Sequence, residues 1–97
     1  MRVLFEPKPP HRSPFRRGRR YRVVKSFEAE RDRFEAGEIL IYRRDAYSIY
    51  DGLTGYFFSE TTASRRMRVW DWDDYNGPPK WRCVFEPLPA PVLLWRL

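Results

Sequence analysis

The sequence predicts an all-β domain, a small barrel of five to six short antiparallel strands with an extended basic N-terminal arm. Between residues 18 and 58, aromatic and β-branched residues alternate with polar residues in short runs, a pattern typical of half-buried strands. Turn signals containing Gly, Asp or Asn separate the runs at regular intervals. No segment shows the 3.6-residue period of an amphipathic helix. The 97 residues suffice for one domain with a modest core.

The predicted strands follow one another closely along the chain. Side chains of residues 21 to 27 alternate between two faces, which indicates a half-buried first strand. Residues 39 to 42 are apolar on both faces, which indicates a central strand, and residues 43 to 45 are expected to reverse the chain. Asp51-Gly52 is a strong hairpin-turn signal. The other predicted strands cover residues 46 to 50, 55 to 58, 67 to 73 and 81 to 85.

Charge and proline content divide the chain into a basic arm (residues 1 to 17), a barrel (residues 18 to 86) and a Pro-rich apolar tail (residues 87 to 97). Residues 1 to 22 carry eight Lys or Arg and one acid, whereas the rest of the chain carries eleven and twelve. Four prolines within the arm interrupt any helix, so we expect it to be extended. The tail is expected to pack on the barrel, because an exposed apolar terminus is costly in water.

A long charged loop, residues 28 to 36, follows the first predicted strand, and its flanks resemble SH3 domains. The first strand, long loop and diverging turn of that family look like Phe27-Glu28-Ala29 and Phe34-Glu35-Ala36-Gly37-Glu38-Ile39-Leu40. A wider pattern is similar to a family of small uncharacterised bacterial proteins: Gly18-x-x-Tyr21-x-Val23, Phe27, Gly37-Glu38 and Tyr50-Asp51-Gly52-Leu53. The resemblance implies an SH3-like barrel of two orthogonally packed sheets. It does not imply proline-ligand binding, because the paired Trp residues and the Pro-Ser-Asn-Tyr motif of signalling SH3 domains are missing.

The number of cysteines and the length of the apolar runs bear on the cellular compartment of the protein. The lone Cys83 cannot form an intramolecular disulfide, and no Cys/His cluster predicts a metal, so we expect no cofactor and a reducing compartment, the cytoplasm. No apolar run reaches membrane-spanning length, and the N-terminus lacks the apolar region of a secretory signal.

Three residue groups could carry chemistry, and each has a simpler explanation. Asp71, Asp73 and Asp74 resemble a cation site, but their spacing is more typical of a solvated strand edge. His11 has no second ligand or nucleophile nearby in the sequence, and Cys83 is expected to be a buried, inert thiol. We therefore expect no catalytic activity.

Aromatic residues supply the leading functional hypothesis, binding of a protein partner through one face of the barrel. Seventeen aromatic residues exceed the needs of a small core. The candidate contact residues are Tyr47, Tyr50, Tyr56, Trp70 and Trp72. If they point outward from neighbouring strands, they form a patch that binds a peptide, stacks nucleobases or serves only to pair the strands.

Arginines supply the alternative hypothesis, nucleic-acid binding. The candidate phosphate-binding residues are Arg16, Arg17, Arg19, Arg20 and Arg22, with the aromatic residues stacking on bases. A nearly neutral body argues against an extended nucleic-acid track, and a basic run is also typical of a solvated terminus. We expect a monomer or weak homodimer that does not bind membranes.

Overall fold

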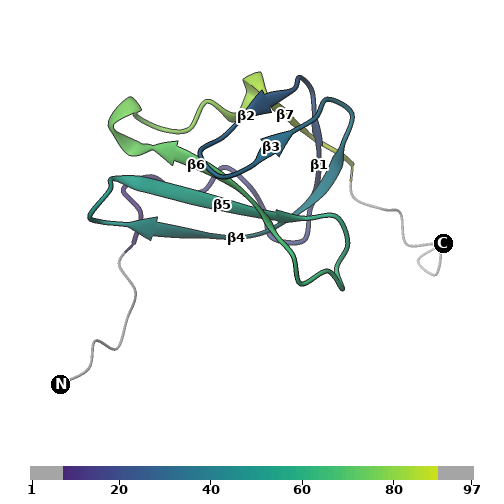
Figure 1. The fold of residues 1–97 in the computed structure, drawn as a ribbon, viewed down its shortest axis with the longest axis horizontal. Helices are drawn as coiled ribbons and strands as arrows, with labels where there is room; N and C mark the ends of the chain where they lie inside the picture. Colours follow the sequence, from purple (N-terminus) through teal and green to yellow (C-terminus); the bar gives the residue numbers. More distant parts are fainter. Residues whose placement is uncertain (1–7, 90–97) are drawn as a thin grey trace.

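The computed structural model describes residues 8–89, an all-β fold with seven strands and two short 3-10 helices (Figure 1). The strands are β1 (Arg20–Val23), β2 (Phe27–Glu28), β3 (Arg33–Phe34), β4 (Ile39–Ser48), β5 (Leu53–Ser59), β6 (Arg68–Asp73) and β7 (Phe85–Pro87). The 3-10 helices are η1 (Asp74–Asn76) and η2 (Trp81–Cys83). The expected all-β class is confirmed, whereas the first seven residues of the expected arm and most of the expected tail lie outside the described residues.

Five strands form one antiparallel sheet in the order β6-β5-β4-β1-β7, and β2 and β3 form a separate hairpin. The sheet does not close into the expected barrel, because β6 and β7 are its two unpaired edges in the described part of the chain. The hairpin bridges these edges: the Phe27 ring lies 6.2 Å from that of Trp70 in β6 and 5.7 Å from that of Phe85 in β7. In a closed barrel the two edge strands, β6 and β7, would pair with each other. Here the side chains of the hairpin cover the core between them instead.

Strand β4 is longer than the sequence pattern indicated. The expected reversal at residues 43 to 45 is wrong, because β4 continues through them and pairs with β5 from Ile41 to Ser48. The register shifts between Tyr42 and Arg44, which marks a bulge. The bulge accommodates the charged stretch: the Arg43 guanidinium donates to Ser59 Oγ and to the Thr62 carbonyl, at 3.1 and 3.3 Å.

The core is dominated by aromatic rings, and Phe15 lies at its centre. Phe15 is 5% exposed, and its ring centroid lies 5.1–6.1 Å from those of seven other aromatic side chains. These are Tyr21, Tyr42, Tyr56, Phe58, Trp70, Trp81 and Phe85. The sequence analysis placed Phe15 in the basic arm, but in the structure the end of that segment is part of the folded core.

The C-terminal part differs from the strand expected at residues 81 to 85. Its first three residues form η2, and only from Phe85 does the chain pair with β1. Pro87 is tolerated because β7 is an edge strand in the described sheet. Cys83, expected to be buried, is exposed at the end of η2. Neither 3-10 helix in residues 8–89 is long or apolar enough to cross a membrane.

Candidate functional site

The five aromatic residues predicted to form a contact face do not share one exposed surface. Tyr56 and Trp70 face each other across β5 and β6 and are 0% and 6% exposed, so both belong to the core. Trp72 is half-buried, and its indole Nε1 donates to the Gly77 carbonyl at 2.8 Å. Tyr47 is half-buried and Tyr50 is 93% exposed. Of the predicted set, only Tyr47, Tyr50 and part of Trp72 can meet a partner in this conformation.

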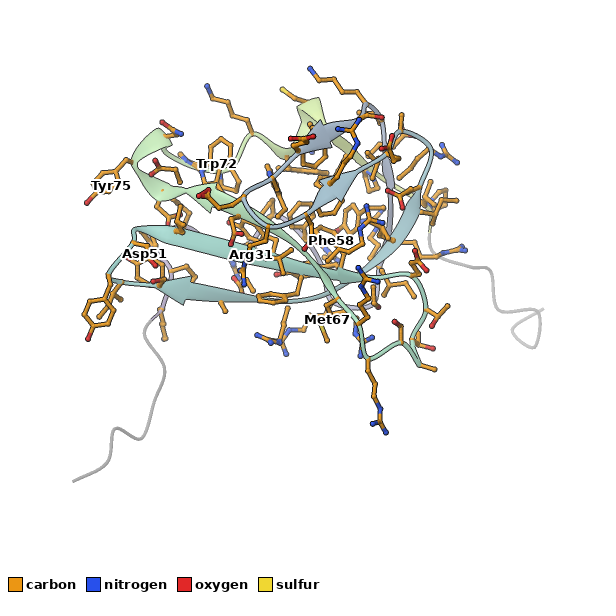
Figure 2. All side chains as sticks on the ribbon, viewed as in Figure 1. Arg31, Asp51, Phe58, Met67, Trp72 and Tyr75 are labelled. Atoms are coloured by element: carbon orange, nitrogen blue, oxygen red, sulfur yellow. The ribbon has the colours of Figure 1, made fainter. Side chains whose placement is uncertain are left out.

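A different aromatic surface lies at the β4–β5 turn, and we call it the aromatic end: Ile49, Tyr50 and Tyr75. These side chains are 54%, 93% and 89% exposed. Tyr75 belongs to η1, far from the turn in sequence, and Figure 2 shows it projecting outward at the end of the molecule where Asp51 lies. Three of the five large hydrophobic side chains exposed in residues 8–89 therefore gather at one end.

Backbone contacts hold the two parts of the aromatic end together. The Asp74 amide donates to the Gly52 carbonyl at 2.9 Å. Gly52 has φ of 66°, and a Cβ at this position would lie 2.9 Å from Tyr75 Cε2. The positive φ is a conformation that glycine adopts without strain, and the absence of a Cβ lets the Tyr75 ring lie close to the turn. Asp73 caps η1 by accepting a hydrogen bond from the Tyr75 amide at 2.9 Å, so the position of Tyr75 is fixed from both sides.

Beside the aromatic end, the outer face of β4 and β5 carries an open groove of about 480 Å³. Its apolar lining includes Tyr47, Leu53 and Phe57. The guanidinium of Arg44 stacks 4.3 Å from the Phe57 ring centroid. Arg31, from the β2–β3 hairpin, closes one side of the groove by a two-point ion pair with Asp71, at 2.8 and 2.9 Å.

The three aspartates weighed as a cation site have separate partners. Asp71 pairs with Arg31, Asp73 caps η1, and Asp74 accepts a hydrogen bond from Thr54 Oγ1 at 2.9 Å. Across residues 8–89, no three His, Cys, Asp or Glu side chains lie close enough to hold a metal ion. The cluster in the sequence is therefore not a cluster of free ligands in space.

A second candidate site lies at the opposite end of β4, and we call it the basic pocket: Arg16, Arg17, Arg19 and Arg20. These four arginines, with Gly18, Ile41, Thr62 and Pro89, line an open cavity of about 680 Å³. The fifth predicted phosphate-binding residue, Arg22, does not line this cavity and pairs with Glu86 across β1 and β7 at 2.7 Å. The structure thus brings together four of the five arginines that the sequence analysis selected.

A third polar cavity, about 420 Å³, is occupied along one side by structural contacts. Arg68 donates both Nη groups to the Glu38 carboxylate and one of them to the Arg33 carbonyl, and it lies 4.8 Å from the Phe34 ring centroid. The hydrogen bond from Arg68 holds the pKa of Glu38 below its ordinary value. Asp32 accepts a hydrogen bond from the Val69 amide at 2.9 Å. These contacts fasten the hairpin to β6.

Two buried tyrosines differ in how their hydroxyls are satisfied. Tyr42 accepts a hydrogen bond from Ser13 Oγ at 3.1 Å, and burial raises its pKa to about 12. Burial also raises the pKa of Tyr56, whose hydroxyl has no hydrogen-bond partner among the described residues. Neither phenol is arranged to lose its proton near neutral pH.

Sequence reasoning missed three residues that define these sites, Phe15, Ile49 and Tyr75. Phe15 stands between Pro14 and Arg16, where no alternation marks a buried position. Tyr75 follows two acids in what reads as a loop, and Ile49 belongs to a stretch predicted as a strand. Only the Asn76-Gly77-Pro78 turn signal after Tyr75 could have suggested that this ring lies at a chain reversal.

Comparison of this chain with family models, curated proteins and solved structures finds no match. The resemblance to SH3 domains therefore stays a prediction, and the function has to be argued from the chain's own residues.

Proposed function

We propose that this chain is a cytoplasmic, non-enzymatic interaction module that binds a protein partner at the aromatic end and its adjoining groove. The observation that carries the proposal is the gathering of Ile49, Tyr50 and Tyr75 at one end of the molecule with most of their side-chain surface in water. Single exposed apolar residues are common, but several exposed apolar side chains at one end of a molecule are typical of protein-binding surfaces. Tyrosine also supplies large contact area at low cost in side-chain entropy.

The surroundings of these residues support a preformed site. The turn and η1 are fixed to each other by the Asp74–Gly52 hydrogen bond and by the Asp73 cap, so little ordering would be needed on binding. The groove continues the apolar surface to Tyr47, Leu53 and Phe57. Glu30 and Asp51 also line it, which favours a partner that presents a basic side chain next to an apolar one.

The test is capture of the partner from the source cells with the full chain and with a Tyr50→Ser/Tyr75→Ser variant, followed by titration of the captured protein. We expect the double substitution to weaken binding by at least roughly 30-fold, since each buried tyrosine at such a surface contributes about 1–2 kcal/mol. Binding should weaken only modestly as salt rises, because the contact is mainly apolar and only Glu30 and Asp51 would attract a basic side chain of the partner.

The matched control is Val24→Ser/Ile39→Ser, which removes two apolar side chains that are 42% and 43% exposed elsewhere on the molecule. The control should keep the wild-type affinity. Equal weakening by the two double variants, or no weakening by either, would show that the aromatic end is not the binding surface.

A further inference from the structure

We propose that the basic pocket is a second, independent site that binds the phosphodiester backbone of nucleic acid without sequence preference. It lies at the start of β4, where Arg20 pairs with Ile41, whereas the aromatic end follows the last residue of that strand. The separation along β4 is roughly 20–25 Å at the usual rise per residue. Tyr50 and Tyr75 therefore cannot stack on the bases next to the phosphates that these arginines contact.

The charge of the pocket has no acidic partner within the described chain. Among residues 8–89, no carboxylate lies within 4.0 Å of the Arg16, Arg17, Arg19 or Arg20 guanidinium groups. Other arginines nearby in the fold are paired, such as Arg22 with Glu86. Four neighbouring uncompensated guanidinium groups produce a strong local positive potential, which attracts a polyanion.

The backbone that carries the arginines is held in place from both sides. The buried Phe15 ring anchors the segment immediately before Arg16, and the Arg16 amide donates to the Tyr21 hydroxyl at 2.9 Å. The Gly18 amide donates to the Tyr42 carbonyl at 2.8 Å, and Gly18 takes φ of 80°, which glycine adopts without strain. A fixed backbone reduces the ordering that a ligand would have to impose.

One arginine of the pocket is also positioned through its side chain. Arg19 is half-buried, and its Nε donates to the Leu88 carbonyl at 3.2 Å, which leaves its terminal nitrogens to bind an anion. Arg16, Arg17 and Arg20 are exposed. Guanidinium groups bind phosphate oxygens in pairs of parallel hydrogen bonds.

The ligand that fits best is an extended phosphodiester chain. The cavity is open and wide, about 680 Å³, and its cations are spread along a continuous segment around one glycine. Several phosphates in a row can each meet one arginine, and release of their counterions supplies the affinity. The remaining lining residues, Gly18, Ile41, Thr62 and Pro89, supply a single side-chain hydroxyl, that of Thr62, which is too little to read the base edges of several successive nucleotides.

The experiment is fluorescence anisotropy of a labelled single-stranded DNA of mixed sequence, titrated with the full chain at two salt concentrations. The test variant is Arg17→Gln/Arg20→Gln, which removes two exposed charges from the pocket. Lys25→Gln/Lys80→Gln is the control, because it removes the same charge from exposed positions outside the pocket. Thermal unfolding of each variant verifies that the fold is kept.

We expect the test variant to bind roughly 10- to 30-fold more weakly at about 0.1 M salt, with a log K against log salt slope reduced by about 1.4, or 0.7 for each lost phosphate contact. The control should change affinity by no more than the general loss of charge, about 2-fold, and Tyr50→Ser/Tyr75→Ser should bind as wild type. Equal losses in the test and control variants would overturn the proposal, because they would show binding by net charge alone. Wild-type binding too weak to saturate near physiological salt would overturn it as well.

Discussion

The two ends of β4 use aromatic side chains in opposite ways. At the start of the strand, an arginine-rich segment is held against the sheet by the preceding Phe15, whose ring is buried among seven others at the centre of the core. At the other end, Tyr50 and Tyr75 are almost fully exposed. The comparison teaches that residue type alone does not separate core from binding surface in this chain, because the long-range packing decides it.

The largest test of this comparison is truncation of an aromatic ring at each end. Phe15→Ala should lower the free energy of unfolding by about 3–5 kcal/mol, since it removes a buried ring and leaves a cavity. Tyr75→Ala should change it by less than about 0.5 kcal/mol, because the side chain is 89% exposed. Urea unfolding followed by tryptophan fluorescence measures both values. Similar costs for the two substitutions would mean that Phe15 is not part of the core in solution.

A smaller effect is expected from the ion pair of Arg68 with Glu38, part of the contacts that fasten the β2–β3 hairpin to β6. Arg68→Gln should cost about 1–2 kcal/mol, between the values of exposed and buried ion pairs, because Arg68 and Glu38 are 16% and 27% exposed. The pKa of Glu38 is lowered in the folded state by its hydrogen bond from Arg68. The stability that ionised Glu38 contributes is therefore complete at pH values above its ordinary pKa of 4.5. This stability is lost as the pH falls through the folded-state pKa.

The measurement is the urea midpoint of wild type and Arg68→Gln between neutral pH and about pH 3. The wild type should lose more stability than the variant on acidification. Parallel pH profiles would indicate that the pair contributes nothing in solution. The same variant should leave both the aromatic end and the basic pocket intact, because neither includes Arg68.

The smallest effects separate two of the buried tyrosines, Tyr42 and Tyr56. Tyr42→Phe should cost about 1 kcal/mol because it removes the Ser13 hydrogen bond, which ties the segment before the basic pocket to β4. Tyr56→Phe should be neutral or stabilising by up to about 1 kcal/mol, since the hydroxyl it removes is buried without a described partner. Thermal unfolding at neutral pH distinguishes these outcomes. If Tyr56→Phe lowered the stability more than Tyr42→Phe, the unpaired hydroxyl would be that of Tyr42 and not that of Tyr56.

The same phenols also predict how the fold responds to alkali. Burial raises both pKa values above the ordinary 10.0, so the stability they contribute is complete below pH 10 and is lost as pH rises toward the folded-state values. The wild-type melting temperature should therefore decrease from about pH 10 upward, and Tyr42→Phe should reduce that decrease. An identical decrease in the variant would assign the alkaline response to other groups.

Much of the sheet was predictable from local pattern. Alternation marked the strands near Tyr21 and Trp70, and the Asp51-Gly52 signal marked the β4–β5 turn, because a period of two and turn chemistry act within a few residues. The arginines of the basic pocket were also identified, since they are adjacent in sequence. Only some of the predicted aromatic contact residues are exposed in the structure. Alternation shows which residues share a face of the sheet, but not which face is buried by other parts of the chain.

By itself, the sequence determined the all-β class, the approximate positions of β1, β5 and β6 and the concentration of positive charge before residue 23. The tertiary structure alone decided that Phe15 enters the core, that β4 continues through residues 43 to 45, and that Tyr75 joins Tyr50 at one end. The physical reason is the distance along the chain over which each effect acts. Propensity, turn chemistry and charge are properties of neighbouring residues, whereas burial depends on segments brought together from far along the chain.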